Sequence, residues 1–132
     1  MSIEYTQEAE INAQELAKLF DRSGIRRPTD DLDRLRRMID GSDLIVTAWD
    51  GNKLVGVARS LTDFSYCCYL SDLAVDYDYQ KMGIGTELIS RVQQAVGDEC
   101  TVLLVSAPKA VDFYEKIGLE PITTGWMIKR KR

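Results

Sequence analysis

Apolar residues recur at helical spacing in two stretches near the N-terminus of the chain. The first stretch starts at Asn12 and ends at Gly24. The second begins after Thr29 or Asp30, either of which can cap a helix, and it ends at Gly41. The apolar positions that share a face are Leu16, Leu19 and Phe20 in the first stretch and Leu32, Leu35, Met38 and Ile39 in the second. This spacing predicts two amphipathic helices.

Three apolar segments follow, with the lengths and turn signals of consecutive strands. They cover Leu44–Trp49, Lys53–Leu61 and Tyr66–Val75, and a weakly alternating Ser2–Thr6 precedes the helices as an edge strand. The Asp50-Gly51 pair is typical of a tight hairpin turn, because both central residues of that turn type need positive φ. The pattern therefore predicts an antiparallel meander.

After Val75 the pattern alternates between helix and strand. A period of 3.6 predicts a helix that buries Ile84, Leu88, Ile89, Val92 and Val96. The continuous apolar run Cys100–Val105 predicts a strand that is buried on both faces. A short helix is expected over Pro108–Lys116 and a closing strand over Ile122–Arg130. The expected fold is α/β, with a single mixed, mostly antiparallel sheet and helices on both faces.

The composition narrows the class of protein. The 132 residues fit one domain spanning 1–132, and the formal charge of −4 gives no general attraction to nucleic acid. We interpret the basic Arg34–Arg37 and Lys129–Arg132 as a solvated helix face and a charged tail. The sequence lacks a run of about 18 apolar residues, so it predicts no membrane span. Its N-terminal residues also lack the basic and apolar regions that predict a signal peptide. We therefore expect a cytoplasmic protein whose three cysteines are reduced.

The sequence contains no histidine. This absence excludes a histidine-based triad and removes the most common zinc ligand, so we expect no metal site. A cysteine nucleophile would also lack its usual histidine partner, which argues against a covalent acyl-cysteine route.

The stretch from Asp72 to Thr86 is the strongest candidate for chemistry. It predicts a strand, a polar turn and two glycines, Gly83 and Gly85, that open directly into a helix. Unpaired backbone N–H groups and the helix dipole at such a start favour an anion, so we expect a phosphate-bearing ligand here. The Walker loop does not fit, because Gly85 is not followed by lysine, and the dinucleotide fingerprint lacks its third glycine at Leu88.

What remains is Gln80-Lys81-Met82-Gly83-Ile84-Gly85, which matches a Q/R-x-x-G-x-G/A pattern. Leu73-Ala74-Val75 precedes it, and Phe113-Tyr114-Glu115-Lys116-Ile117-Gly118-Leu119 lies downstream. With these neighbours the chain resembles the GNAT superfamily of acyl-coenzyme A dependent N-acetyltransferases. Leu119 departs from the family pattern, in which phenylalanine is usual.

The resemblance implies acetyl-coenzyme A as cosubstrate, with its pyrophosphate on the backbone of the glycine turn. It also implies that the strand ending at Val75 splays from the next one and pairs with the pantetheine amides, as a peptide pairs with a sheet edge. Lys81 is either a phosphate partner or a plain exposed lysine. The coenzyme-binding residues implied in this way are Leu73, Ala74, Val75, Gln80, Lys81, Met82, Gly83, Ile84, Gly85 and Thr86.

Acetyl transfer to an amine needs a base and a partner for the leaving thiolate. Neutralising an amine with a pKa of roughly 10.4 at pH 7 costs about 4.6 kcal/mol. Asp72 is the carboxylate nearest to the reactive end and our candidate base, although a structural aspartate, a tyrosine or a water chain remain open. Tyr114 matches the family tyrosine that donates a proton or hydrogen bond to the coenzyme sulfur; a core aromatic is its alternative. The resemblance implies direct transfer in a ternary complex.

The acceptor is less constrained than the donor. We expect the primary amine of a small molecule. A protein lysine or N-terminus, or a non-catalytic acyl-coenzyme A sensing module, are the alternatives. Arg26 and Arg27, in the loop between the first two helices, are either solvated, paired with nearby aspartates, or able to hold an acidic group of the acceptor. Association into a homodimer through the C-terminal strand is left open by the sequence.

Overall fold

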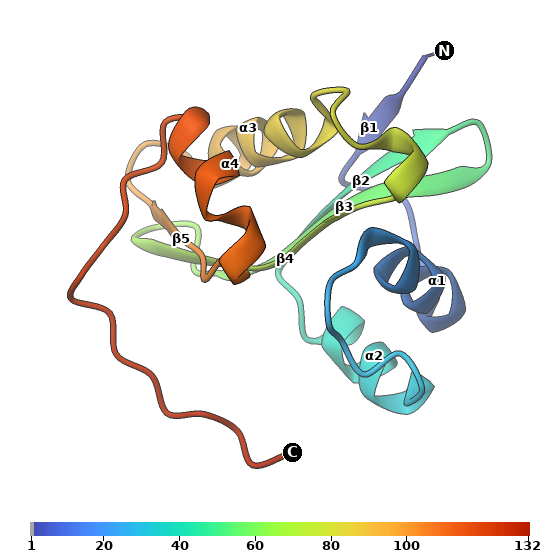
Figure 1. Ribbon diagram of the computed structural model, residues 1–132, viewed down its shortest axis with the longest axis horizontal. Helices are drawn as coiled ribbons and strands as arrows, with labels where there is room; N and C mark the ends of the chain where they lie inside the picture. The colour runs from blue at the N-terminus through green and yellow to red at the C-terminus, as the bar shows by residue number, and fades with distance from the viewer. Residues whose placement is uncertain (1) are drawn as a thin grey trace.

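The computed structural model describes residues 2–132 and arranges them as helices on both faces of one sheet (Figure 1). The strands are β1 (Glu4–Thr6), β2 (Leu44–Asp50), β3 (Lys53–Thr62), β4 (Cys67–Val75) and β5 (Thr101–Leu103). The helices are α1 (Ala13–Ser23), α2 (Leu32–Asp40), α3 (Ile84–Val96) and α4 (Val111–Lys116), with single 3-10 turns η1 (Tyr77–Tyr79) and η2 (Pro108–Ala110). The expected fold class is confirmed.

Within residues 2–132 the sheet has the strand order β1-β2-β3-β4-β5. The first four strands pair antiparallel, and only β5 runs parallel to its neighbour β4. The register between β3 and β4 shifts where Arg59 opposes Asp72 and Ser60 opposes Leu70, which leaves Ser71 as the extra residue of a bulge. The bulge lies beside Asp72, at the point where β4 approaches the glycine turn.

Two hydrophobic cores hold the helices to the sheet. α1 and α2 cover one face, with Leu16, Phe20 and Leu35 fully buried. α3 covers the other face with the five residues that its sequence pattern predicts, Ile84, Leu88, Ile89, Val92 and Val96. The N-terminus of α1 is a capping box, in which Asn12 accepts from the N–H of Glu15 and Glu15 reaches back to the N–H of Asn12.

Three expectations about local structure are wrong. α2 is capped by Asp31 rather than by Thr29 or Asp30, because the Asp31 carboxylate accepts from the N–H of Arg34. β5 is shorter than expected and is not buried on both faces, since α1 and α2 do not extend to cover it and Leu103 stays exposed. Residues 122–130 form no strand, because no neighbouring strand pairs with them.

Candidate functional site

β4 and β5 separate soon after they meet. They pair only from Cys67 to Tyr69 on β4, opposite Thr101 to Leu103 on β5, whereas β4 continues to Val75. Beyond Tyr69, β4 therefore continues to pair with β3 on one side, apart from the bulge residue Ser71, and no strand among residues 2–132 pairs with its other side. This confirms the expected splay and leaves Leu73, Ala74 and Val75 with a free edge.

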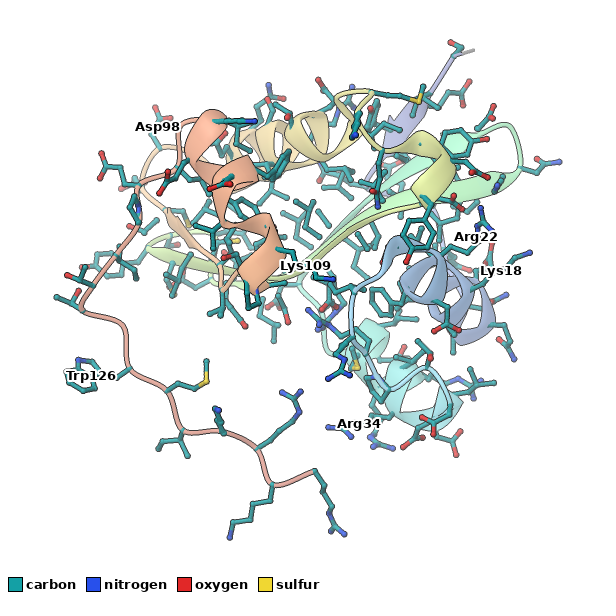
Figure 2. All side chains as sticks on the ribbon, viewed as in Figure 1. Lys18, Arg22, Arg34, Asp98, Lys109 and Trp126 are labelled. Atoms are coloured by element: carbon teal, nitrogen blue, oxygen red, sulfur yellow. The ribbon has the colours of Figure 1, made fainter. Side chains whose placement is uncertain are left out.

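A buried carboxylate fixes the turn that follows β4. Asp76 is 1% exposed and accepts from Arg22 Nε at 2.6 Å and from Arg22 Nη2 at 3.0 Å. It also accepts from the backbone N–H of Asp78 at 2.9 Å, and Lys53 Nζ lies 3.7 Å away. The Arg22 hydrogen bonds are the main reason that the pKa of Asp76 is lowered. Figure 2 shows Arg22 on α1 directly beside this turn.

Gln80 closes the end of the strand. Its Nε2 donates to the Val75 carbonyl at 2.9 Å and to the Ser23 carbonyl at 3.3 Å, so one side chain joins β4, the turn and α1. Lys81 follows with φ of +66°, a left-handed conformation that is uncommon for lysine. The backbone after Gln80 is thereby directed toward the start of α3.

The start of α3 leaves its backbone donors free of side-chain caps. Gly83 is the N-cap residue with φ of +83°, and no side chain caps the helix. A Cβ on Gly83 would meet nothing within 4 Å, whereas a Cβ on Gly85 would lie 3.3 Å from Phe113 Cζ. The first N–H groups of a helix have no intrahelical acceptor. This helix start therefore presents backbone donors without a side-chain cap, with Phe113 of α4 beside Gly85.

Gly56 on β3, which sequence reasoning missed, brings α3 close to the sheet. A Cβ there would lie 3.1 Å from Ile84 Cγ2 and 3.2 Å from Leu88 Cδ1. Both Ile84 and Leu88 belong to α3. Because Gly56 has no side chain, the start of α3 can lie close to the sheet beside β4. Within the sequence, a glycine in the middle of an apolar strand is the signal for such a close approach.

Asp72 lies under α1 and α2 and is fully buried. Its Oδ1 accepts from Arg27 Nε and its Oδ2 accepts from Arg59 Nε, each at 2.5 Å. Arg27 also donates from Nη2 to the Ser71 carbonyl at 2.9 Å, and Arg59 donates from Nη2 to Ser71 Oγ at 3.1 Å. Both carboxylate oxygens are thus engaged, and the α1–α2 loop is tied to the bulge of β4.

Tyr114 lies on α4, which follows β5 in the chain, on the other side of the point where β4 and β5 separate. It is half-buried against the core under α3, and its ring meets that of Phe113 edge-on with centroids 5.1 Å apart. Burial raises the pKa of the Tyr114 phenol, while the positive charge of Arg27 acts in the opposite direction. The phenol is therefore a neutral hydrogen-bond donor at physiological pH.

The cysteines lie away from this region. Cys67 and Cys68 begin β4, and Cys100 immediately precedes β5, at the opposite end of β4 from Val75. The pKa of Cys67 is raised chiefly by the charge of Asp63, and that of Cys68 by burial. A raised pKa disfavours the thiolate that a nucleophile requires.

Two absences concern residues 2–132 alone. None of their helices has the length and apolar character needed to cross a membrane. They also contain no group of three or more cysteine, aspartate or glutamate side chains placed to hold a metal ion.

Comparisons with known proteins point to one family. A model of the acetyltransferase (GNAT) domain matches residues 6–125. The uncharacterized N-acetyltransferase ycf52 of Gracilaria tenuistipitata var. liui is 33% identical over 117 residues, covering 82% of this chain; the match spans 62% of that protein's length.

Solved structures share the fold. A probable acetyltransferase from methicillin-resistant Staphylococcus aureus superposes with a TM-score of 0.83 at 19% identity, covering 98% of this chain and all of the other. A putative acetyltransferase from Deinococcus radiodurans R1 gives a TM-score of 0.78 at 25% identity, covering 98% of this chain and 88% of the other.

Proposed function

Because this chain belongs to the GNAT acetyltransferase family, we propose that it transfers an acetyl group from acetyl-coenzyme A to the primary amine of a small molecule, by direct transfer in a ternary complex. The observation that carries the proposal is the free edge of β4 leading into an uncapped helix start at Gly83. The whole of residues 1–132 acts in this proposal as one catalytic domain located in the cytoplasm.

The residues present fit the donor. The uncapped N–H groups from Gly83 to Thr86 would hold the pyrophosphate, because backbone donors and the helix dipole both favour its charge. Open space at the Gly83 Cβ position lets a phosphate approach the backbone. The free edge of Leu73–Val75 would pair with the pantetheine amides, as an added strand does. When bound, acetyl-coenzyme A supplies the activated acetyl thioester.

Further contacts complete this proposed cradle. Gln80 holds the turn in place through the Val75 carbonyl, and Met82, about half exposed, flanks the turn. Lys81 and the N–H of Ile84 add positive charge and a donor on the same stretch, and Gly85 leaves room between α3 and Phe113. These residues lie together because η1 ends at Tyr79 and α3 begins at Ile84.

We assign to Tyr114 the hydrogen bond that stabilises the leaving sulfur. A phenol is less acidic than a thiol, with pKa values of about 10 and 8.5, so complete proton transfer is uphill by roughly 2 kcal/mol. Donation of a hydrogen bond as charge develops on sulfur avoids that cost. Burial of Tyr114 keeps the phenol protonated, and the Arg27 charge favours the developing anion.

Asp72, which the sequence predicts as the base, is in a position to hold two arginine side chains instead. Each oxygen of its carboxylate already accepts a hydrogen bond from a guanidinium, and the side chain has no exposed surface. We propose that Asp72 positions Arg27 and Arg59, and that a water molecule removes the proton of the amine.

The first experiment measures the release of free coenzyme A thiol across a panel of primary amines, together with acetyl-coenzyme A binding by calorimetry. We expect binding and turnover with at least one small amine. Binding without turnover on a broad panel would contradict the enzyme and support a sensing module. Turnover on peptides alone would reassign the acceptor to a protein.

The second experiment tests Tyr114 with an amine that is turned over. Tyr114→Phe removes only the phenolic hydroxyl, so we expect kcat to fall by about 100-fold, within the usual range for the loss of one hydrogen-bond donor to a developing anion, while coenzyme binding stays unchanged. Tyr66→Phe, at an exposed position in the turn before β4, is the matched control and should keep full activity. An unchanged kcat in Tyr114→Phe would refute the assignment.

A further inference from the structure

The 3-10 turn η1, which leads into the glycine turn, is held by the tip of the β2–β3 hairpin. Tyr79, the last residue of η1, donates from its hydroxyl to Asp50 Oδ2 at 2.5 Å. Lys53 Nζ lies 5.1 Å from the centre of the same ring and 3.7 Å from Asp76 Oδ2. Asp50 and Lys53 are partners in the β2–β3 ladder, so the end of the hairpin contacts η1 through two side chains (Figure 1).

The hairpin itself does not require this carboxylate. Gly51 and Asn52 lie between the paired Asp50 and Lys53 and form the turn, with a φ of +58° at Gly51. Asp50 is the last residue of β2, and its side chain is free to bind η1. A charged acceptor strengthens a hydrogen bond, and the bond to Asp50 raises the pKa of the Tyr79 phenol, so the hydroxyl keeps its proton and donates.

Tyr79 is joined directly to the proposed phosphate site. Its side chain is buried in the same hydrophobic cluster as Ile84, the first residue of α3. The next residue, Gln80, donates to the last carbonyl of β4, and Lys81 then takes a φ of +66°. A lysine in this left-handed conformation persists where the surrounding structure fixes it. Tyr79 provides such a fixed point immediately before the turn.

We propose that Tyr79 is a positioning residue for donor binding, because its hydrogen bond to Asp50 holds the Gln80–Gly83 turn so that the backbone donors at the start of α3 face the pyrophosphate of acetyl-coenzyme A. This role rests on the proposed function, in which the turn binds the donor. The bond acts on affinity and not on the chemical step, since donors that are already in place need no rearrangement when the anion binds.

The first test measures the affinity for acetyl-coenzyme A by calorimetry. Tyr79→Phe removes only the hydroxyl and Asp50→Ala removes its acceptor, so each should weaken binding by about tenfold. Asp50→Asn keeps an acceptor oxygen and should retain most of the affinity. Combining Tyr79→Phe with Asp50→Ala should weaken binding no further than either change alone, because both remove the same contact. Additive losses would contradict a role of this hydrogen bond.

Steady-state kinetics with an amine that is turned over give a second measure. In Tyr79→Phe the KM for acetyl-coenzyme A should rise while kcat stays unchanged, the reverse of the pattern expected for Tyr114→Phe. A lower kcat with an unchanged KM would show that Tyr79 acts on the chemical step and would overturn the positioning role.

Two controls separate positioning from a general loss of stability. Tyr77→Phe alters the other tyrosine of η1, whose hydroxyl forms no hydrogen bond within residues 2–132, and it should keep the affinity of the unaltered protein. Gly51→Ala strains the hairpin turn but keeps Asp50 and Lys53, so it should lose stability in urea denaturation without losing affinity. A tenfold loss of affinity in either control would refute the role of the Tyr79–Asp50 bond.

The positioning role and the proposed function fail in different ways. If the unaltered protein does not bind acetyl-coenzyme A, the proposed function fails and the positioning role fails with it. If the unaltered protein binds and Tyr79→Phe binds equally tightly, only the positioning role is refuted.

Discussion

The two walls of the candidate site, β4 with its following turn on one side and α4 on the other, are held in very different ways. On the β4 side, two buried carboxylates, Asp72 and Asp76, bind three arginines from α1, the α1–α2 loop and β3. On the other side, η2 and α4 bury no residue completely, and Tyr114 rests on partial contacts. The side proposed to bind the donor is thus built before any ligand arrives, whereas the Tyr114 side has fewer contacts to fix it.

This difference indicates a division of work between the walls. A backbone anion site gains from rigidity, because its donors then need no reorganisation when the phosphate binds. A wall with few buried contacts is easier to displace. Substitutions should therefore cost most stability on the β4 side and least on α4.

The largest effect is expected for Asp72→Ala. Removing this carboxylate leaves Arg59, almost fully buried, and Arg27 without their partner, and breaking one member of a buried ion pair costs about 3–5 kcal/mol. Urea denaturation measures the loss. Asp98→Ala, at an exposed position after α3, should change stability by less than about 0.5 kcal/mol. A similarly small loss in Asp72→Ala would abolish the contrast between the walls.

The next largest effect is expected for Asp76→Asn, which weakens the charged hydrogen bonds from Arg22 and should cost about 2 kcal/mol. Because the folded pKa of Asp76 lies below its ordinary value of 3.8, its contribution is fully present above pH 4 and is lost as the pH falls through the folded pKa. Denaturation between pH 7 and pH 2 should therefore show a shallower acid loss in Asp76→Asn. Asp78→Asn, an exposed contact of the same arginine, is the control and should keep the slope of the unaltered protein.

A smaller effect is expected for Gly56→Ala. The added methyl group would lie 3.1 Å from Ile84 Cγ2 and push α3 from the sheet, at a cost of about 1–3 kcal/mol. The affinity for acetyl-coenzyme A should fall as well, because the start of α3 moves relative to β4. Gly51→Ala, in the open β2–β3 hairpin where φ is +58°, should lose stability but keep its coenzyme affinity. Equal affinities in the two variants would show that the position of the helix start does not affect the binding of acetyl-coenzyme A.

The smallest effect is expected on α4. Phe113 packs edge-on against Tyr114 but is more than one-third exposed, so Phe113→Ala should cost about 1 kcal/mol, well below the 3–5 kcal/mol of a fully buried phenylalanine. Thermal denaturation checks this value. A loss as large as that of Asp72→Ala would mean that both walls are equally fixed.

Several features of the protein could be predicted from local sequence patterns. The five residues that α3 buries were expected from their 3.6-residue period, and the meander from its strand lengths and the Asp50-Gly51 turn. These features depend on residues close to one another in the chain, so the spacing of apolar residues in the sequence predicts them directly. The glycine turn belongs to the same class, because its glycines, its flanking strand and its helix are contiguous.

The partners of the buried charges could not be predicted in this way. Asp72 joins Arg27, 45 residues earlier in the chain, and Asp76 joins Arg22, 54 residues earlier. No repeating spacing in the sequence identifies such pairs, because each aspartate could pair with any of many arginines. The sequence therefore predicts Asp72 as a candidate base but gives no sign of its two guanidinium partners.

The sequence alone determined the helices, the meander, the glycine turn and the family to which they belong, because each is encoded in neighbouring residues. Only the tertiary structure decided that β5 lies at an exposed edge, that residues 122–130 remain unpaired, and that two buried aspartates fix the β4 side of the candidate site. Strand pairing and charge burial depend on what arrives from distant parts of the chain, and an apolar pattern specifies a strand without specifying its partner.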